Sequence, residues 1–210
     1  MKNIDCTLYC ITNSDGMSEE TFLSKVKGAC EGGVTLVQLR EKDRSTLSYY
    51  ELACKVKKIT DAYEIPLIID DHIDVAMAVG CGVHLGAEDM PISVARSIMG
   101  KDVIIGATAK TVEAAIKAEA DGADYIGCGA IYPTKTHAKT KITKVEVLNE
   151  ICKTVNIPVA AIGGLKKDNL SILKDSPIQG VCVVSAIMDA EDTKKASEEL
   201  LEEVHKILHK

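Results

Sequence analysis

The sequence predicts an α/β protein: a single (β/α)8 TIM barrel domain spanning residues 1–210. Eight short runs of β-branched and apolar residues each precede a longer stretch with helical periodicity. Strict alternation of strands and helices is typical of a parallel sheet with helical crossovers. Eight such units are the number that closes a barrel, and its active site is expected at the carboxyl ends of the strands.

The predicted strands are bounded by turn residues and carry few charges. They are Thr7–Thr12, Thr35–Arg40, Pro66–Asp71, Gly82–Gly86, Asp102–Thr108, Ala123–Gly129, Pro158–Gly164 and Gly180–Ile187. Ser18 and Ser45 are expected to cap the first two helices, because a serine side chain accepts from a free amide of the first turn. Thr111 precedes a helix over Val112–Ala120, and the last helix runs from about Glu191 to Leu208. Tyr132–Ile142 is a long loop of the kind that binds or covers ligands.

The composition excludes several classes of protein. The net charge is −6 and aromatic residues are few, so no nucleic-acid partner is indicated. No apolar stretch approaches the ~20 residues of a membrane span, and the N-terminus lacks a signal-peptide pattern. The eight cysteines form no Cys-x-x-Cys pair and are expected to be free thiols. These observations predict a cytoplasmic protein without a membrane partner and leave a homo-oligomer open.

Two cations follow the second predicted strand, in Gln38-Leu39-Arg40-Glu41-Lys42. Alternation places Gln38 and Arg40 on one side of the strand and Leu39 on the other. Arg40 and Lys42 at a barrel mouth can bind a phosphate or diphosphate, the first as a fork and the second as a point charge. The alternative is that Arg40 pairs with Glu41 or Asp43 on a solvated rim.

Carboxylates gather at the ends of the next two strands, as Asp70-Asp71 and Glu88-Asp89. Carboxylates brought close together repel each other unless a cation lies between them. Mg²⁺ is suited to this role, because it binds one or two carboxylates together with phosphate oxygens and water. The alternative for one residue of each pair is a helix N-cap.

Two further segments are suited to a second anion. Gly163-Gly164 ends the seventh strand and Ser185 lies near the end of the eighth, where barrels commonly bind phosphate. Thr134-Lys135-Thr136-His137 in the long loop offers hydroxyls, a cation and an imidazole, although a solvated loop explains it equally well. The pattern therefore predicts two anionic groups and one divalent cation in one mouth, which favours diphosphate displacement over proton abstraction.

Together these segments resemble the thiamine phosphate synthase family over nearly the whole chain. The matching pieces are Tyr9-Cys10-Ile11-Thr12, Gln38-Leu39-Arg40-Glu41-Lys42, Asp70-Asp71-His72, Val83 to Pro91, Ile131-Tyr132-Pro133-Thr134, Ala161-Ile162-Gly163-Gly164 and Val183 to Ile187. The resemblance implies two small phosphorylated substrates, hydroxymethylpyrimidine diphosphate and thiazole phosphate, which the enzyme joins as thiamine phosphate. It also implies Mg²⁺-assisted loss of diphosphate before the thiazole nitrogen attacks.

The resemblance also implies a role for individual residues. The catalytic set is Arg40, Lys42, Thr108 and His137, and the Mg²⁺ ligands are Asp71 and Asp89. The substrate-binding set is Gln38, Leu39, Arg40, Glu41, Lys42, Asp70, Thr108, Thr134, Lys135, Thr136, His137, Gly164, Val184 and Ser185. The chain departs from the usual pattern at Asp70 (usually Asn), His72 (Arg), Ala87 (Gln), Thr108 (Ser), Ala130 (Pro) and His137 (Lys).

Three other functions compete with this interpretation. A thiazole tautomerase shares the barrel but needs no diphosphate-bound Mg²⁺. A sugar-phosphate epimerase would use Asp71, His72, His84 and Asp89 around a metal that favours histidine ligands. A catalytically silent barrel would bind the pyrimidine diphosphate without turnover.

Overall fold

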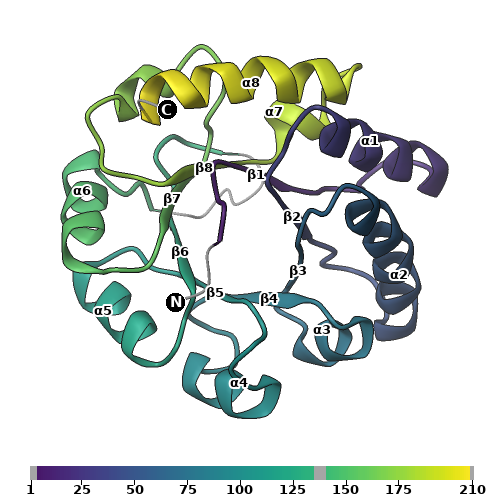
Figure 1. Cartoon of the computed structure of the whole chain (residues 1–210), viewed down its shortest axis with the longest axis horizontal. Coiled ribbons are helices and arrows are strands. Elements are labelled where there is room, and N and C mark those ends of the chain that lie inside the picture. Colours follow the sequence, from purple (N-terminus) through teal and green to yellow (C-terminus); the bar gives the residue numbers. More distant parts are fainter. Residues whose placement is uncertain (1–3, 135–140, 209–210) are drawn as a thin grey trace.

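The structure, a computed structural model, describes residues 4–134 and 141–208. Within them, eight parallel strands close into a barrel in sequence order, and β8 pairs with β1. Helices surround the ring of strands on all sides (Figure 1). The predicted (β/α)8 barrel is therefore confirmed.

Each strand is four or five residues long and is followed by a helical segment. The strands are β1 (Leu8–Ile11), β2 (Leu36–Leu39), β3 (Leu67–Asp70), β4 (Gly82–Leu85), β5 (Ile105–Thr108), β6 (Tyr125–Gly129), β7 (Val159–Ile162) and β8 (Gly180–Val183). The helices are α1 (Glu19–Glu31), α2 (Thr46–Ala62), α3 (Ile73–Val79), α4 (Ile92–Met99), α5 (Val112–Ala120), α6 (Val145–Thr154), α7 (Ser185–Met188) and α8 (Thr193–Leu208), with a 3₁₀ helix η1 (Leu170–Leu173).

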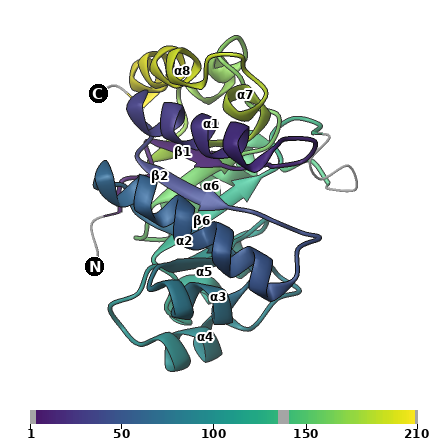
Figure 2. The same ribbon diagram turned by 90° about the vertical axis from the view of Figure 1, so that its right-hand side faces the viewer.

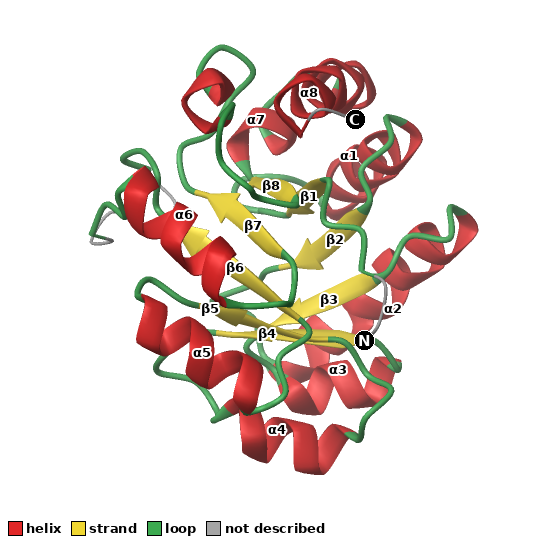
Figure 3. Ribbon diagram, turned by 60° about the vertical axis from the view of Figure 1, so that its left-hand side comes forward, coloured by secondary structure: helices red, strands yellow, loops and turns green. Residues whose placement is uncertain are grey.

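Side chains alternate along every strand between the barrel interior and the layer beneath the helices. In β1, Leu8 and Cys10 join the large apolar cluster under the helices, whereas Tyr9 and Ile11 join the smaller cluster inside the barrel. The helices lie outside the strands throughout (Figure 3), and α1 and α2 lie in front of β1 and β2 in Figure 2. Both faces of the sheet are thus buried, which accounts for the aliphatic composition.

Polar caps begin the helices where the sequence predicts them. The side chains of Ser18, Ser45 and Thr111 each accept a hydrogen bond from the backbone N–H three residues later, at 3.2, 3.3 and 3.2 Å. Such a cap satisfies one of the amides that a helix start leaves without an internal partner. No helix of the described residues is long and apolar enough to cross a membrane.

The predicted eighth strand, 180–187, is wrong beyond Val183, because the chain turns at Val184 into the short helix α7. The carbonyl of Val184 accepts from the N–H groups of Ile187 and Met188 and so starts that helix. Ser185 therefore opens a helix instead of lying within a strand.

Two other expectations about the elements also need correction. The fifth strand begins at Ile105 and not at Asp102, because the Asp124 carboxylate accepts a hydrogen bond from the Ile105 N–H, at 2.9 Å, where the strand starts. The seventh unit has no α-helix between its strand and the next one, and the 3₁₀ turn η1 takes its place. The strict alternation of strands with α-helices thus fails in one unit, without changing the closure of the barrel.

Candidate active site

Four polar side chains face the interior at the carboxyl ends of neighbouring strands. Gln38 lies on β2, Asp70 on β3, His84 on β4 and Thr108 on β5. Gln38, Asp70 and His84 are all buried, and strand pairing places Asp70 directly beside His84. The expectation that strand ends would assemble one polar mouth is met by these positions.

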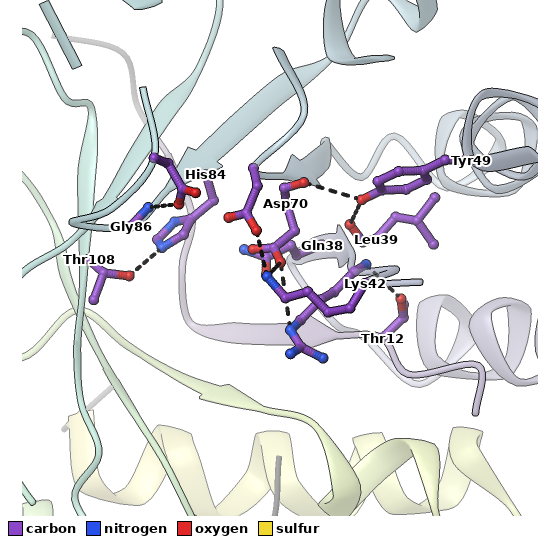
Figure 4. Close-up of polar contacts among 12 residues, drawn as sticks. Thr12, Gln38, Leu39, Lys42, Tyr49, Asp70, His84, Gly86 and Thr108 are labelled. Carbon is purple, nitrogen blue, oxygen red and sulfur yellow. Dashed lines mark hydrogen bonds and ion pairs between the residues drawn. The ribbon is translucent and has the colours of Figure 1, made fainter. Parts of the chain in front are cut away.

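Lys42 lies between two carboxylates at this mouth. Its Nζ is 3.0 Å from Oδ2 of Asp70 and 2.5 Å from Oδ2 of Asp71 (Figure 4 shows the Asp70 contact). Burial works to lower the pKa of Lys42, but the contacts with Asp71 and Asp70 outweigh it and raise the pKa. Lys42 is therefore a charged ammonium that neutralises part of the acidic cluster.

Arg40 points into the same region from just beyond β2. Its Nε lies 3.6 Å from Oδ2 of Asp70, and its side chain is 13% exposed. That distance is an ion pair without a hydrogen bond, and among the described residues the buried Nε has no hydrogen-bond partner. The backbone N–H of Arg40 donates to the Thr12 hydroxyl at 3.2 Å, which ties it to the end of β1. A buried guanidinium donor without an acceptor is suited to an anionic ligand.

Asp71 and Asp89 lie within hydrogen-bonding reach of each other. Asp71 adopts a left-handed backbone conformation with a φ of 61°, and Oδ2 of Asp89 accepts from the Gly86 N–H at 2.6 Å. Burial raises the pKa of Asp89 against the effect of that N–H, and Asp71 raises it further. Burial also acts on Asp71, but hydrogen bonds from Lys42 and Asp89 lower its pKa overall.

Two carboxyl groups this close together provide a place for a cation. Asp70 adds to the acidity, and burial followed by the charge of Asp71 raises its pKa, against Lys42 and Arg40. The oxygen-only donor set fits Mg²⁺, which needs few protein ligands when phosphate oxygens complete its shell. No three His, Cys, Asp or Glu side chains of the described residues are grouped around a metal position, and this includes the set that the epimerase alternative would use.

Two residues of the predicted substrate-binding set lie beside the mouth in other environments. The Leu39 side chain is fully buried in the layer under the helices, so only its backbone borders the site. The Glu41 carboxylate accepts from Ser14 Oγ at 2.7 Å and from Arg44 Nε at 2.6 Å. These contacts brace the loop that carries Arg40 and Lys42.

A cavity of about 900 Å³ opens in front of these residues. Arg40, Lys42 and Glu41 line it from the β2–α2 loop, and it also reaches the segments after β6, β7 and β8. The predicted phosphate-binding residues on those segments border the same space: Thr134, Gly164, Val184 and Ser185. Arg40 and Lys42 thus border the same cavity as these four residues. Lys135, Thr136 and His137 lie outside the described residues.

Gly163 and Gly164 both have positive φ, at 104° and 64°. A Cβ on Gly164 would lie 2.7 Å from the Pro133 carbonyl oxygen and 2.7 Å from Tyr132 Cβ. The Asn169 amide donates to the Gly164 carbonyl at 2.9 Å and fixes the turn. A side chain at this position would close the gap between the β6 and β7 loops, so glycine keeps the backbone open to a ligand.

Sequence reasoning missed the two tyrosines of the polar interior beneath this mouth, Tyr9 and Tyr125, although it allowed for His84 as a buried imidazole with hydrogen-bond partners. His84 contacts Thr108 Oγ1 through Nε2 at 2.9 Å (Figure 4) and the Tyr125 hydroxyl through Nδ1 at 3.0 Å. Burial lowers the pKa of His84 to about 4, so this imidazole is neutral. A tyrosine at an inward position of a buried strand was the available signal, since its hydroxyl needs a buried partner.

The comparisons with known proteins agree with one another. A family described as "Thiamine monophosphate synthase" matches residues 8–187. "Thiamine-phosphate synthase 2" of Streptococcus pneumoniae is 51% identical over 202 residues, covering 96% of each chain. "Thiamine-phosphate synthase" of Clostridium tetani is 48% identical over 200 residues, covering 95% of this chain and 96% of its own. The solved "Thiamine phosphate pyrophosphorylase" of Pyrococcus furiosus has a TM-score of 0.89 at 40% identity, covering 98% of both chains.

Proposed function

Because the chain belongs to the thiamine monophosphate synthase family, we propose that it joins hydroxymethylpyrimidine diphosphate to thiazole phosphate, giving thiamine phosphate and diphosphate. The protein is a transferase of thiamine biosynthesis, as its relatives are named. The observation that carries the finer proposal is the placement of Arg40 and Lys42 beside an acidic pair, in the same cavity as Gly164 and Ser185. One cavity then holds a cationic site for diphosphate and an open backbone site for a monophosphate.

The bond that breaks is the one between the pyrimidine methylene carbon and the diphosphate oxygen. The diphosphate leaves with the electron pair, and the resulting carbon cation accepts the lone pair of the thiazole nitrogen. Arg40 and Lys42 bind the departing oxygens, and their charge stabilises the leaving group as negative charge builds on it. Gln38 and Thr108, at the ends of β2 and β5, would orient the pyrimidine diphosphate.

Asp71 and Asp89 would hold Mg²⁺, which neutralises charge on the diphosphate when bound. A cation between these two carboxyls would favour the ionised form of both. Lys42 also contacts Asp71. Its ammonium group is therefore placed to move from the carboxylates to the phosphate oxygens of the substrate.

The second substrate enters on the side of β7 and β8. Gly164, Val184, Ser185 and Thr134 would bind the thiazole phosphate through backbone amides and hydroxyls. Lys135, Thr136 and His137 stay in the proposed site on the strength of the resemblance alone. The eight thiols are all unpaired, which supports a cytoplasmic location.

The direct test mixes the purified protein with both substrates and Mg²⁺ and follows the products by mass spectrometry. Thiamine phosphate and diphosphate should form in equal amounts, and omission of either substrate or chelation of the metal should stop both. A protein that changes only the thiazole compound would be a tautomerase. A protein that binds the pyrimidine diphosphate and forms no product would be a silent barrel.

A further inference from the structure

Five polar side chains form an unbroken hydrogen-bonded row across the barrel interior, here named the interior chain. In order they are Gln38, Tyr9, Tyr125, His84 and Thr108, from β2, β1, β6, β4 and β5. Successive polar atoms lie 2.7, 2.7, 3.0 and 2.9 Å apart. The interior chain therefore links two residues of the proposed pyrimidine diphosphate site through three residues that have no role in that proposal.

The barrel is built around the rings of the interior chain. A Cβ on Gly106 would lie 2.1 Å from Cζ of Tyr125, and a Cβ on Gly127 would lie 3.4 Å from Cε1 of His84. Tyr9 and Tyr125 are almost completely buried, and their rings meet edge to face with centroids 5.7 Å apart. Strand β5 thus gives up side-chain volume at Gly106 to hold the Tyr125 ring, whereas Gly127 leaves the His84 ring at ordinary van der Waals distance.

The hydrogens along the interior chain follow one direction. Burial raises the pKa of both tyrosines, so each keeps its hydrogen. The buried His84 ring lies between two hydroxyls, a setting that suits an imidazole with one N–H donor and one acceptor nitrogen. The Gln38 nitrogen donates to Tyr9. When each hydroxyl uses its hydrogen inside the interior chain, the Tyr9 hydroxyl donates to Tyr125 and the Tyr125 hydroxyl donates to His84 Nδ1. The single imidazole hydrogen then sits on Nε2 and donates to Thr108 Oγ1.

This order fixes what the two ends offer to a ligand. The Gln38 amide has its nitrogen turned to Tyr9, which leaves its oxygen to accept a hydrogen bond. The Thr108 hydroxyl accepts from His84, which leaves its hydrogen to be donated. One end of the interior chain is an acceptor and the other is a donor, and neither can reverse unless all five groups reverse together.

We propose that Tyr9, Tyr125 and His84 are positioning residues that hold Gln38 as an acceptor and Thr108 as a donor toward the pyrimidine diphosphate. This inference rests on the proposed function, which supplies an amino-bearing ring and a diphosphate oxygen as partners of opposite polarity. Groups oriented in advance cost no reorganisation when the ligand binds, and a water-excluded interior strengthens each contact.

The main test is Tyr125→Phe, which keeps the ring in the space left by Gly106 and removes the central hydroxyl. The KM for the pyrimidine diphosphate should rise about five- to tenfold, the factor for one lost hydrogen bond, whereas the KM for the thiazole phosphate should stay unchanged. The matched control is Tyr49→Phe. Tyr49 is equally buried, but its hydroxyl donates to the Leu39 carbonyl at 2.6 Å outside the interior chain. The control loses the stabilisation of that hydrogen bond but should keep the ratio of the two KM values.

Two further measurements separate orientation from simple packing. Nitrogen-15 NMR of labelled histidine should show His84 of the wild type as the Nε2–H tautomer, and Tyr125→Phe should mix the tautomers. The double variant Tyr9→Phe/Tyr125→Phe should be no worse than the worse single variant, because one break already releases the interior chain. Additive losses would overturn the proposal.

The remaining outcomes each decide a separate point. An Nδ1–H tautomer in the wild type overturns the inference, even if Tyr125→Phe fails to fold. An active wild type whose KM values are unaffected by Tyr125→Phe, or affected equally by Tyr49→Phe, overturns the inference and leaves the proposed function standing. A wild type that makes no thiamine phosphate overturns the proposed function, and with it the ligand named here.

Discussion

Replacement of Lys42 by methionine should affect the two ligands of the mouth in opposite directions. The ammonium lies 3.0 Å from Asp70 and 2.5 Å from Asp71, so it competes with a metal ion for the same negative charge. An ammonium and a divalent ion ~4 Å apart repel by about 2 kcal/mol in water and by about 8 kcal/mol near a protein surface, twice the value for two unit charges. Because the Lys42 side chain is 42% exposed, solvent screening favours the lower end, about 2 kcal/mol. Mg²⁺ should therefore bind Lys42→Met ~30-fold more tightly in the absence of substrates.

Isothermal titration of Mg²⁺ into the substrate-free protein measures the gain in Mg²⁺ affinity. Steady-state kinetics measures the expected loss of affinity for the pyrimidine diphosphate. The KM for the pyrimidine diphosphate should rise in Lys42→Met, because the leaving group loses a cation. The matched control is Lys55→Met, which removes an ion pair with Glu19 between α1 and α2 and should change neither value. Unchanged or weaker Mg²⁺ binding by Lys42→Met would refute the reasoning.

The other predictions concern a proposed metal ligand, a glycine turn and the titration of a buried histidine. Asp89→Asn should abolish Mg²⁺-dependent turnover with the fold intact, whereas Asp74→Asn, at an exposed side chain of α3, should not; equal activities would remove Asp89 from the metal site. Gly164→Ala should cost about 1 to 2 kcal/mol of unfolding free energy for its backbone and about 1 to 3 more for the clash with Pro133, measured in urea. Gly16 has a φ of +72°, but a Cβ there would have no neighbour within 4 Å, so Gly16→Ala should show only the backbone cost. Because burial lowers the pKa of His84 to about 4, the unfolded chain takes up this proton first, and stability should fall as the pH drops from about 6.5 toward 4, by at most about 1.4 kcal/mol per pH unit. A pH-independent stability in that range would contradict this assignment.

The sequence predicted the barrel because its signal is local. Each strand is a short apolar run between turn residues, and each capping serine or threonine acts within its own helix. The errors arise where a distant or competing contact decides the outcome. The start of β5 is fixed by a hydrogen bond to Asp124, which belongs to the following unit. The eighth strand stops because the Val184 carbonyl accepts hydrogen bonds from amides of α7.

The same distinction applies to the candidate site. Strand ends predicted that Asp70, Asp71 and Asp89 would meet, because the position of a residue on a barrel strand determines which end it reaches. The sequence could not show that Lys42 would lie between two of these carboxylates. Its four-carbon stem permits many directions, and the direction depends on charges from another strand.

The pairing of Gly106 with Tyr125 means that these two positions cannot vary independently. They are opposite each other in the register of β5 and β6, and the ring of one occupies the volume that the other leaves empty. A methyl group at 106 would require a smaller residue at 125, and a small residue at 125 would leave a void that only a larger residue at 106 could fill. Relatives that lose the phenol should therefore show a compensating exchange on the adjacent strand. A redesign of this barrel for a ligand of another shape would therefore have to change both positions together.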